Sequence, residues 1–179
     1  MRRYRIANDG LSSHFITCRI VQWLPVFISD EYCKIIVDSL QYCREHKGLL
    51  LWAYVIMPTH LHLVGAAREG YDLSNIMRDF RRHTSKAIST QLTVDKNRLF
   101  LYVMAREAAK GGEPGAEYKV WADDFHPEVL RSEKFFWQKV KYLHDNPVRN
   151  GLVAASEHWK YSSANYYLNG EGPLEIDKE

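Results

Sequence analysis

Residues 54–64 read YVIMPTHLHLV, and this stretch predicts a β-hairpin that carries two histidines. The apolar run 49–57 is typical of a buried strand, and the segment after Pro58 is typical of its returning partner. Pro58 has no amide hydrogen for a sheet ladder, which places it in the turn between the two strands. Side chains alternate between the two faces of a strand, so His60 and His62 lie on the same face, about 7 Å apart along it.

The rest of the chain alternates between strand-like and helix-like patterns. The expected elements are a strand at 14–23, a helix at 29–48, the hairpin, a helix at 72–91 that continues after a break near Asp95, a strand at 118–130 and a helix at 132–146. This order predicts an α+β fold: a ferredoxin-like antiparallel β-sheet with helices packed on one face, plus a C-terminal helix.

Length and composition predict one domain over residues 1–179, with a flexible basic arm at 1–8 and a flexible acidic tail at 170–179. The net charge of +2 is too small to indicate a nucleic-acid-binding protein by itself. The three cysteines form no CxxC pair, which favours a reducing cytoplasm over a disulfide framework or a zinc site. The longest apolar run is too short to span a bilayer, so we expect no membrane partner.

The histidine pair is a candidate metal site. Two neutral imidazoles on one face can share a divalent ion, but they can equally be half-buried polar positions at the solvent face of the strand. A third ligand is needed, and the helix at 132–146 offers the amide oxygen of Asn146. Tyr142 lies four residues earlier, on the same face of the helix as Asn146, which would place it beside the metal. The alternative for Tyr142 is a core aromatic.

Three motifs in this order resemble a known family. They are PTHLHLV after the apolar strand, YLHDNPVRNGLV, and HWKYSSA. Together they are similar to the HUH-type transposases with a single catalytic tyrosine, in the branch of the REP-associated tyrosine transposases. The resemblance implies that His60, His62 and Asn146 bind the metal and that Tyr142, on the C-terminal helix, is the nucleophile.

The function implied by this resemblance is a metal-dependent single-stranded DNA endonuclease and strand transferase. It would cleave through a 5′-phosphotyrosine intermediate, in DNA transposition or in the processing of REP-type hairpins, with Mg²⁺ or Mn²⁺ as its cofactor. Single-stranded or hairpin DNA is the expected partner. The resemblance leaves open whether a homodimer forms and whether one chain completes the active site.

Local positive charge predicts where DNA is held. Phosphates are neutralised by clusters of lysine and arginine, which occur on the helix at 72–91 and in the N-terminal arm. The predicted DNA-binding residues are Arg78, Arg81, Arg82, Lys86, Arg2 and Arg3. A solvated helix face is the plainer interpretation of the first four.

Two other functions compete with strand transfer. One is a metal-dependent phosphoesterase in which water, rather than a tyrosine, attacks the phosphate. The other is a catalytically silent module that keeps the fold for DNA-hairpin binding, against which the presence of all four candidate site residues argues.

Overall fold

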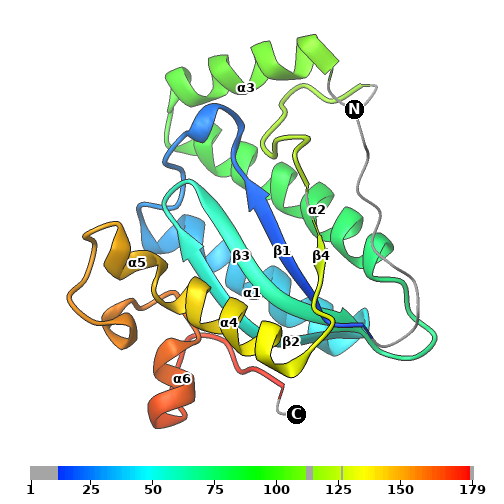
Figure 1. The fold of residues 1–179 in the computed structure, drawn as a ribbon. Coiled ribbons are helices and arrows are strands. Elements are labelled where there is room, and N and C mark those ends of the chain that lie inside the picture. The colour runs from blue at the N-terminus through cyan, green and yellow to red at the C-terminus, as the bar shows by residue number, and fades with distance from the viewer. Residues whose placement is uncertain (1–11, 112–114, 126, 178–179) are drawn as a thin grey trace.

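The computed structural model describes residues 12–111, 115–125 and 127–177. Its elements are β1 (His14–Arg19), η1 (Val21–Trp23), α1 (Asp30–His46), β2 (Leu49–Met57), β3 (His60–Ala67), α2 (Leu73–Val94), α3 (Arg98–Gly111), β4 (Glu128–Val129), α4 (Glu133–His144), α5 (Asn146–Arg149), η2 (Ser156–His158) and α6 (Ala164–Asn169). The strands form an antiparallel sheet in the order β2-β3-β1-β4 (Figure 1). The predicted α+β fold with a ferredoxin-like sheet is confirmed.

The hairpin of β2 and β3 forms as expected, with Met57 paired to His60 across the turn. Leu61 and Leu63 are fully buried in the core beneath α1 and α2. Val64 belongs to a second core cluster, which lies under α4. Because side chains alternate along a strand, His60 and His62 share the face of Val64 and point to the side of the sheet that α4 covers.

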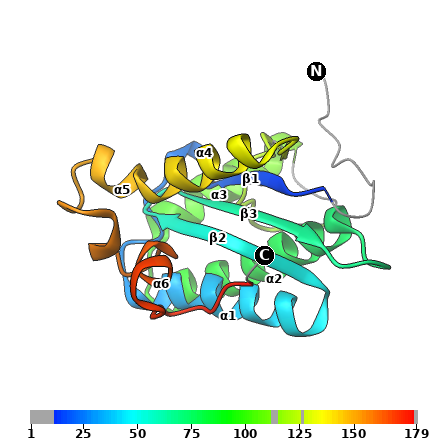
Figure 2. The ribbon, with the colours of Figure 1, turned by 60° about the horizontal axis from the view of Figure 1, so that its bottom comes forward.

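Helices cover both faces of the sheet (Figure 2). Apolar residues of α1 and α2, such as Ile36 and Phe80, pack on one face. On the other face α4 packs through Phe136 and Val140. The helix predicted at the C-terminal end of the fold is thus separated from α1 and α2 by the thickness of the sheet. Ser132 caps this helix by accepting a hydrogen bond from the Phe135 amide.

Two strands are shorter than predicted. The strand expected at 14–23 ends at Arg19, because the chain turns into η1 with left-handed backbone at Gln22 and Trp23. The strand expected at 118–130 reduces to β4 at 128–129. Within that range Trp121 makes a single bridge to Ile20, and its indole nitrogen donates to Thr84 of α2 in the core. This segment is therefore held to β1 and α2 by Trp121 rather than by a continuous ladder of strand hydrogen bonds.

The segment after α5 returns along the outer edge of β2. The Ile56 amide donates to the Tyr161 carbonyl at 2.8 Å, and the Ser163 amide donates to the Tyr54 carbonyl at 3.0 Å. Farther along, the Asp177 amide donates to the Leu51 carbonyl at 2.7 Å. This final part of the chain therefore binds β2 through its backbone.

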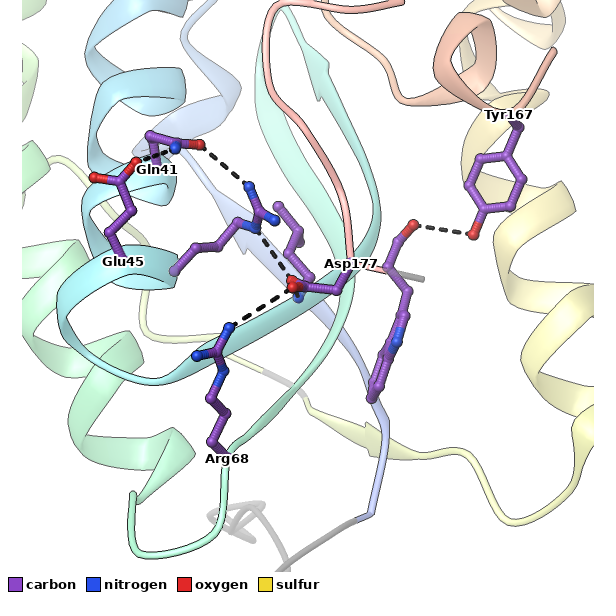
Figure 3. A network of polar contacts seen from close by, with 8 residues as sticks. Gln41, Glu45, Arg68, Tyr167 and Asp177 are labelled. Atoms are coloured by element: carbon purple, nitrogen blue, oxygen red, sulfur yellow. Dashed lines mark hydrogen bonds and ion pairs between the residues drawn. The ribbon is translucent and has the colours of Figure 1, made fainter. Parts of the chain in front are cut away.

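The acidic tail was expected to be flexible, but the residues from Leu174 to Asp177 contact the body of the protein. Leu174 and Ile176 are buried in the main core. The Asp177 carboxylate accepts from the Leu51 amide at 2.8 Å and pairs with Arg44 at 3.1 Å and with Arg68 at 3.9 Å (Figure 3). The basic arm at 1–8 lies outside the described residues, as do positions 178 and 179. No helix in the described ranges is long and apolar enough to cross a membrane.

Candidate active site

The two histidines lie together at the start of β3. Their ring centroids are 4.6 Å apart, and His62 is buried. The Thr59 hydroxyl lies 2.9 Å from His60 Nδ1, and the Thr17 hydroxyl lies 2.8 Å from His62 Nδ1. A hydroxyl that accepts a hydrogen bond from Nδ1–H fixes the imidazole tautomer and leaves the Nε2 lone pair free, as in metal-binding histidines.

Burial keeps both imidazoles neutral. It lowers the pKa of His60 to about 4. Burial, together with the nearby His60, Arg149 and Lys139, lowers the pKa of His62 to about 3. Near pH 7 both rings are therefore in the unprotonated form that binds a metal ion.

Tyr142 lies in the last turn of α4, with its ring centroid 5.9 Å from that of His62. The ring also contacts Phe15 edge-on, and the guanidinium of Arg149 stacks over it at 4.2 Å. The side chain is 41% exposed, so Tyr142 lies at the surface rather than in the core. The structure therefore brings this candidate nucleophile beside His62 and leaves part of it exposed to solvent.

Asn146 begins α5 and is buried. The sequence predicted one helix that carries both Tyr142 and Asn146. The structure differs, because α4 ends at His144. The intervening Asp145 keeps near-helical backbone, so the chain continues to turn in the same sense. The Asn150 amide nitrogen donates to the Asn146 carbonyl at 2.9 Å and to Asn146 Oδ1 at 2.8 Å. These two bonds fix which end of the Asn146 side chain is oxygen, and one lone pair of Oδ1 stays available.

The donor set has the composition of a divalent-metal site. Two neutral imidazoles and an amide oxygen suit Mn²⁺ or Mg²⁺, with coordination positions left for phosphate and water. In the part of the chain that the structure describes, no group of three His, Cys, Asp or Glu side chains is arranged to hold a metal. A third protein ligand for the histidine pair would therefore be of another type, such as the amide of Asn146.

The predicted DNA-binding residues of α2 are not brought to this site. The helix packs on the face of the sheet opposite to α4 (Figure 2). Arg78 pairs with Asp79, and Arg81 donates to the Ala122 carbonyl at 2.6 Å, whereas Arg82 and Lys86 are exposed. Arg2 and Arg3 lie outside the described residues.

Two cations that the sequence did not single out lie at the site instead. Arg149 stacks on the Tyr142 ring, and Lys139 Nζ lies 5.9 Å from its centroid. Lys139 also pairs with Glu128 at 2.5 Å. The three-residue spacing of Lys139 and Tyr142 on one helix could have indicated the lysine, because such residues are neighbours on a helix surface.

Comparison with known proteins adds to this geometry. No family model matches the chain. A Haemophilus influenzae protein that carries the name of a REP-associated tyrosine transposase is 25% identical over 165 residues, which span 91% of this chain and 85% of that protein. A solved structure of a REP-associated tyrosine transposase bound to a REP hairpin also matches. The match covers 100% of this chain and 93% of that chain, with a TM-score of 0.70 and 18% sequence identity.

The resemblance to the REP-associated tyrosine transposases is confirmed. The similarity in sequence spans most of both chains, and the similarity in structure shows that the fold is shared. The prediction that the chain is a tyrosine transposase enzyme agrees with the names of both relatives.

Acid should destabilise the fold through His60, His62 and His144, which are wholly or partly buried. Burial lowers the pKa of His144 to about 4, and those of His60 and His62 are also well below the usual 6.5. Stability is therefore fully present above pH 6.5 and is lost as the pH falls toward 4, since only the unfolded chain binds these protons there. Each histidine contributes at most about 1.4 kcal/mol per pH unit.

Urea unfolding at several pH values in the presence of a chelator measures this slope. The His144→Asn variant should flatten it, whereas replacing the exposed His46 by Asn should not. Equal slopes for His144→Asn and the wild type would contradict the assignment.

Proposed function

We propose that the protein is a metal-dependent single-stranded DNA endonuclease and strand transferase whose nucleophile is Tyr142. The observation that carries this proposal is the placement of the half-exposed Tyr142 ring 5.9 Å from the ring of His62, beside a second histidine. A tyrosine that is exposed to solvent next to a candidate metal-binding histidine pair suits attack on a bound phosphodiester.

The reaction exchanges one ester bond for another. The Tyr142 oxygen attacks phosphorus and loses its proton, the phosphotyrosine bond to the 5′ side forms, and the bond to the 3′ oxygen breaks. That oxygen leaves as a hydroxyl after it takes up a proton. Since the new ester keeps the phosphodiester energy, a 3′-hydroxyl can reverse the step and join another strand.

The surrounding residues prepare this attack. Arg149 and Lys139 place positive charge around the Tyr142 ring, where the anionic phosphate must approach. His60, His62 and Asn146 would hold Mg²⁺ or Mn²⁺, which when bound neutralises charge on the phosphate oxygens. Thr17 and Thr59 orient the two imidazoles through their Nδ1 atoms.

Single-stranded or hairpin DNA is the proposed substrate. The transposase that shares this fold was solved with a REP hairpin bound to it, which supports a DNA hairpin as ligand here. The exposed Arg82 and Lys86 would contact DNA away from the active site, on the α2 side of the molecule. The cytoplasm is the proposed compartment, which the three buried free cysteines support, and one domain per chain is the proposed unit.

One experiment tests the proposal against both competing functions. The protein is incubated with a labelled single-stranded hairpin DNA and Mn²⁺ or Mg²⁺, then separated on a denaturing gel. We expect a protein–DNA adduct that survives denaturation and that mass spectrometry maps to Tyr142. Cleavage without an adduct would indicate a phosphoesterase that uses water, and binding without cleavage would indicate a silent hairpin-binding module.

The Asn150→Ala variant should bind Mn²⁺ more weakly, by roughly 10-fold, because Asn150 orients the Asn146 amide and loss of such outer partners typically costs 10- to 100-fold. Calorimetric titration of the folded variant measures this affinity. Asn169→Ala is the matched control, since it removes an amide pair with Asn165 on α6. An undiminished Mn²⁺ affinity in Asn150→Ala would show that Asn146 is not a metal ligand or that Asn150 does not orient it.

A further inference from the structure

An exposed tryptophan lies beside the histidine pair. Trp23 ends η1, which follows β1, and the residue is 58% exposed. Its ring centroid lies 6.0 Å from that of His60, with the two rings nearly perpendicular. The Ile20 amide donates to the Thr59 carbonyl at 2.9 Å, which ties the start of η1 to the turn that carries His60. The indole therefore keeps a fixed position at the edge of the candidate active site.

The indole is also held in orientation. The Arg19 guanidinium lies over the ring at 4.6 Å from its centroid. Arg19 is itself mostly buried and pairs with Asp124 at 2.7 Å, so the cation is immobilised beneath the indole. Arg19 covers one face of the ring, and the residue as a whole stays 58% exposed. An aromatic ring with one face on a cation and another open to solvent suits a further planar group.

The backbone of η1 that positions the Trp23 ring is in a conformation that costs conformational free energy. Gln22 and Trp23 both have positive φ angles, 53° and 55°, which non-glycine residues rarely adopt. Such backbone conformations persist when surrounding contacts hold them in place, and they concentrate at functional sites. Here one of those contacts is the hydrogen bond from the Gln22 side chain to Glu107 of α3.

We propose that Trp23 is a stacking platform for an unpaired nucleobase next to the scissile phosphate. The proposal rests on the proposed function, because it takes the phosphate to lie between Tyr142 and the histidine pair. A strand whose phosphate lies at His60 carries its neighbouring base within reach of Trp23. The base would stack on the indole face that Arg19 does not cover. The platform would then select unpaired DNA, because only an unpaired base exposes its π surface, and would accept any base.

Binding can be tested without cleavage. In the presence of a chelator, the full chain is titrated into a fluorescein-labelled oligothymidylate and into the same oligonucleotide with every base replaced by an abasic tetrahydrofuran. The wild type should prefer the thymidylate. Trp23→Ala should weaken thymidylate binding by roughly 5- to 100-fold and leave abasic binding unchanged. Trp23→Phe should retain much of the affinity, and Tyr42→Ala, which removes an exposed aromatic on α1, should bind like the wild type.

A fluorescence measurement covers the case in which Trp23→Ala does not fold. A base stacked on an indole quenches its emission, so thymidylate should quench the wild type and should quench Trp23→Phe clearly less. Equal quenching in the two proteins would overturn the proposal. Equal affinity of the wild type for the two oligonucleotides, or an equal loss on both in Trp23→Ala, would also overturn it.

The place of the stacked base is tested on a DNA that forms the adduct. A single abasic site is moved along the strand, and its effect on binding is compared in the wild type and in Trp23→Ala. At a position adjacent to the cleaved bond, the abasic site should weaken binding of the wild type but should weaken binding of Trp23→Ala much less, because the indole on which the base stacks is already gone. Coupling at a distant position only would overturn the assignment. An adduct on Tyr142 without base-dependent binding would overturn this inference and leave the proposed function standing. Base-dependent binding without an adduct would overturn the proposed function, and with it the placement of the base beside a scissile phosphate, and would leave only base stacking on Trp23.

Discussion

The Tyr142→Phe variant should form no covalent adduct and should not cut DNA, while its affinity for hairpin DNA and for Mn²⁺ stays close to that of the wild type. Phenylalanine keeps the ring that Phe15 contacts and on which Arg149 stacks. It deletes the oxygen that attacks phosphorus, so the chemical step is lost rather than slowed by a small factor. A denaturing gel with labelled DNA measures both cleavage and adduct.

Three comparisons make this result decisive. Tyr102→Phe, which removes the hydroxyl of an exposed tyrosine on α3, should cut normally. Asn146→Ala should lose activity but regain part of it at high metal concentration, and Tyr142→Phe should show no such rescue. Loss of a merely structural hydroxyl would lower the free energy of unfolding by about 1 kcal/mol and spare activity. A phenylalanine variant that still cuts at a comparable rate would show that Tyr142 is not the nucleophile.

The His60→Ala variant should bind Mn²⁺ at least roughly 100-fold more weakly than the wild type. Loss of a residue that only supports a metal ligand typically weakens metal affinity roughly 10- to 100-fold, and loss of a ligand itself should cost more. Cleavage should be lost as well. It removes one of two imidazoles from the donor set, and a divalent ion held by His62 and Asn146 alone lacks a ligand. His60 is less buried than His62 and is not stacked on Phe15 as His62 is, so it is the better position for a variant that stays folded.

Calorimetric titration with Mn²⁺ reports on the site independently of DNA cleavage. His46→Ala is the matched control, because it removes an exposed histidine on α1. His62→Ala should also lose the metal, but it leaves a cavity beside Phe15 and should cost roughly 2 kcal/mol of stability or more. Full Mn²⁺ affinity in folded His60→Ala would refute the role of this histidine as a ligand.

Local patterns predicted the parts of the site that depend on a single element. The two-residue period of a strand placed His60 and His62 on one face, and their rings do meet. The approach of Tyr142 to His62 could not be derived from periodicity. It depends on which face of the sheet α4 covers, and the motif resemblance rather than the helix pattern indicated it.

Charge and composition were weaker guides. The cluster at Arg81 suggested DNA binding, but a charge pattern does not say on which side of the sheet its helix packs, and Arg81 is occupied by the Ala122 carbonyl. The tail is acidic and contains few apolar residues, so its composition did not predict that Leu174 and Ile176 are buried in the core. Trp23 was absent from the candidates because nothing in the sequence shows that η1 ends beside His60.

The covering of β2 by the C-terminal segment has a consequence for behaviour in solution. The strand order makes β2 an edge strand, and an open edge offers backbone groups to which a second chain can add a strand. Here Ile56, Tyr54 and Leu51 already bond to residues 161, 163 and 177 of the same chain. Self-association by edge-to-edge strand addition, and the aggregation that follows from it, is therefore blocked along this side of the sheet for as long as the segment stays docked.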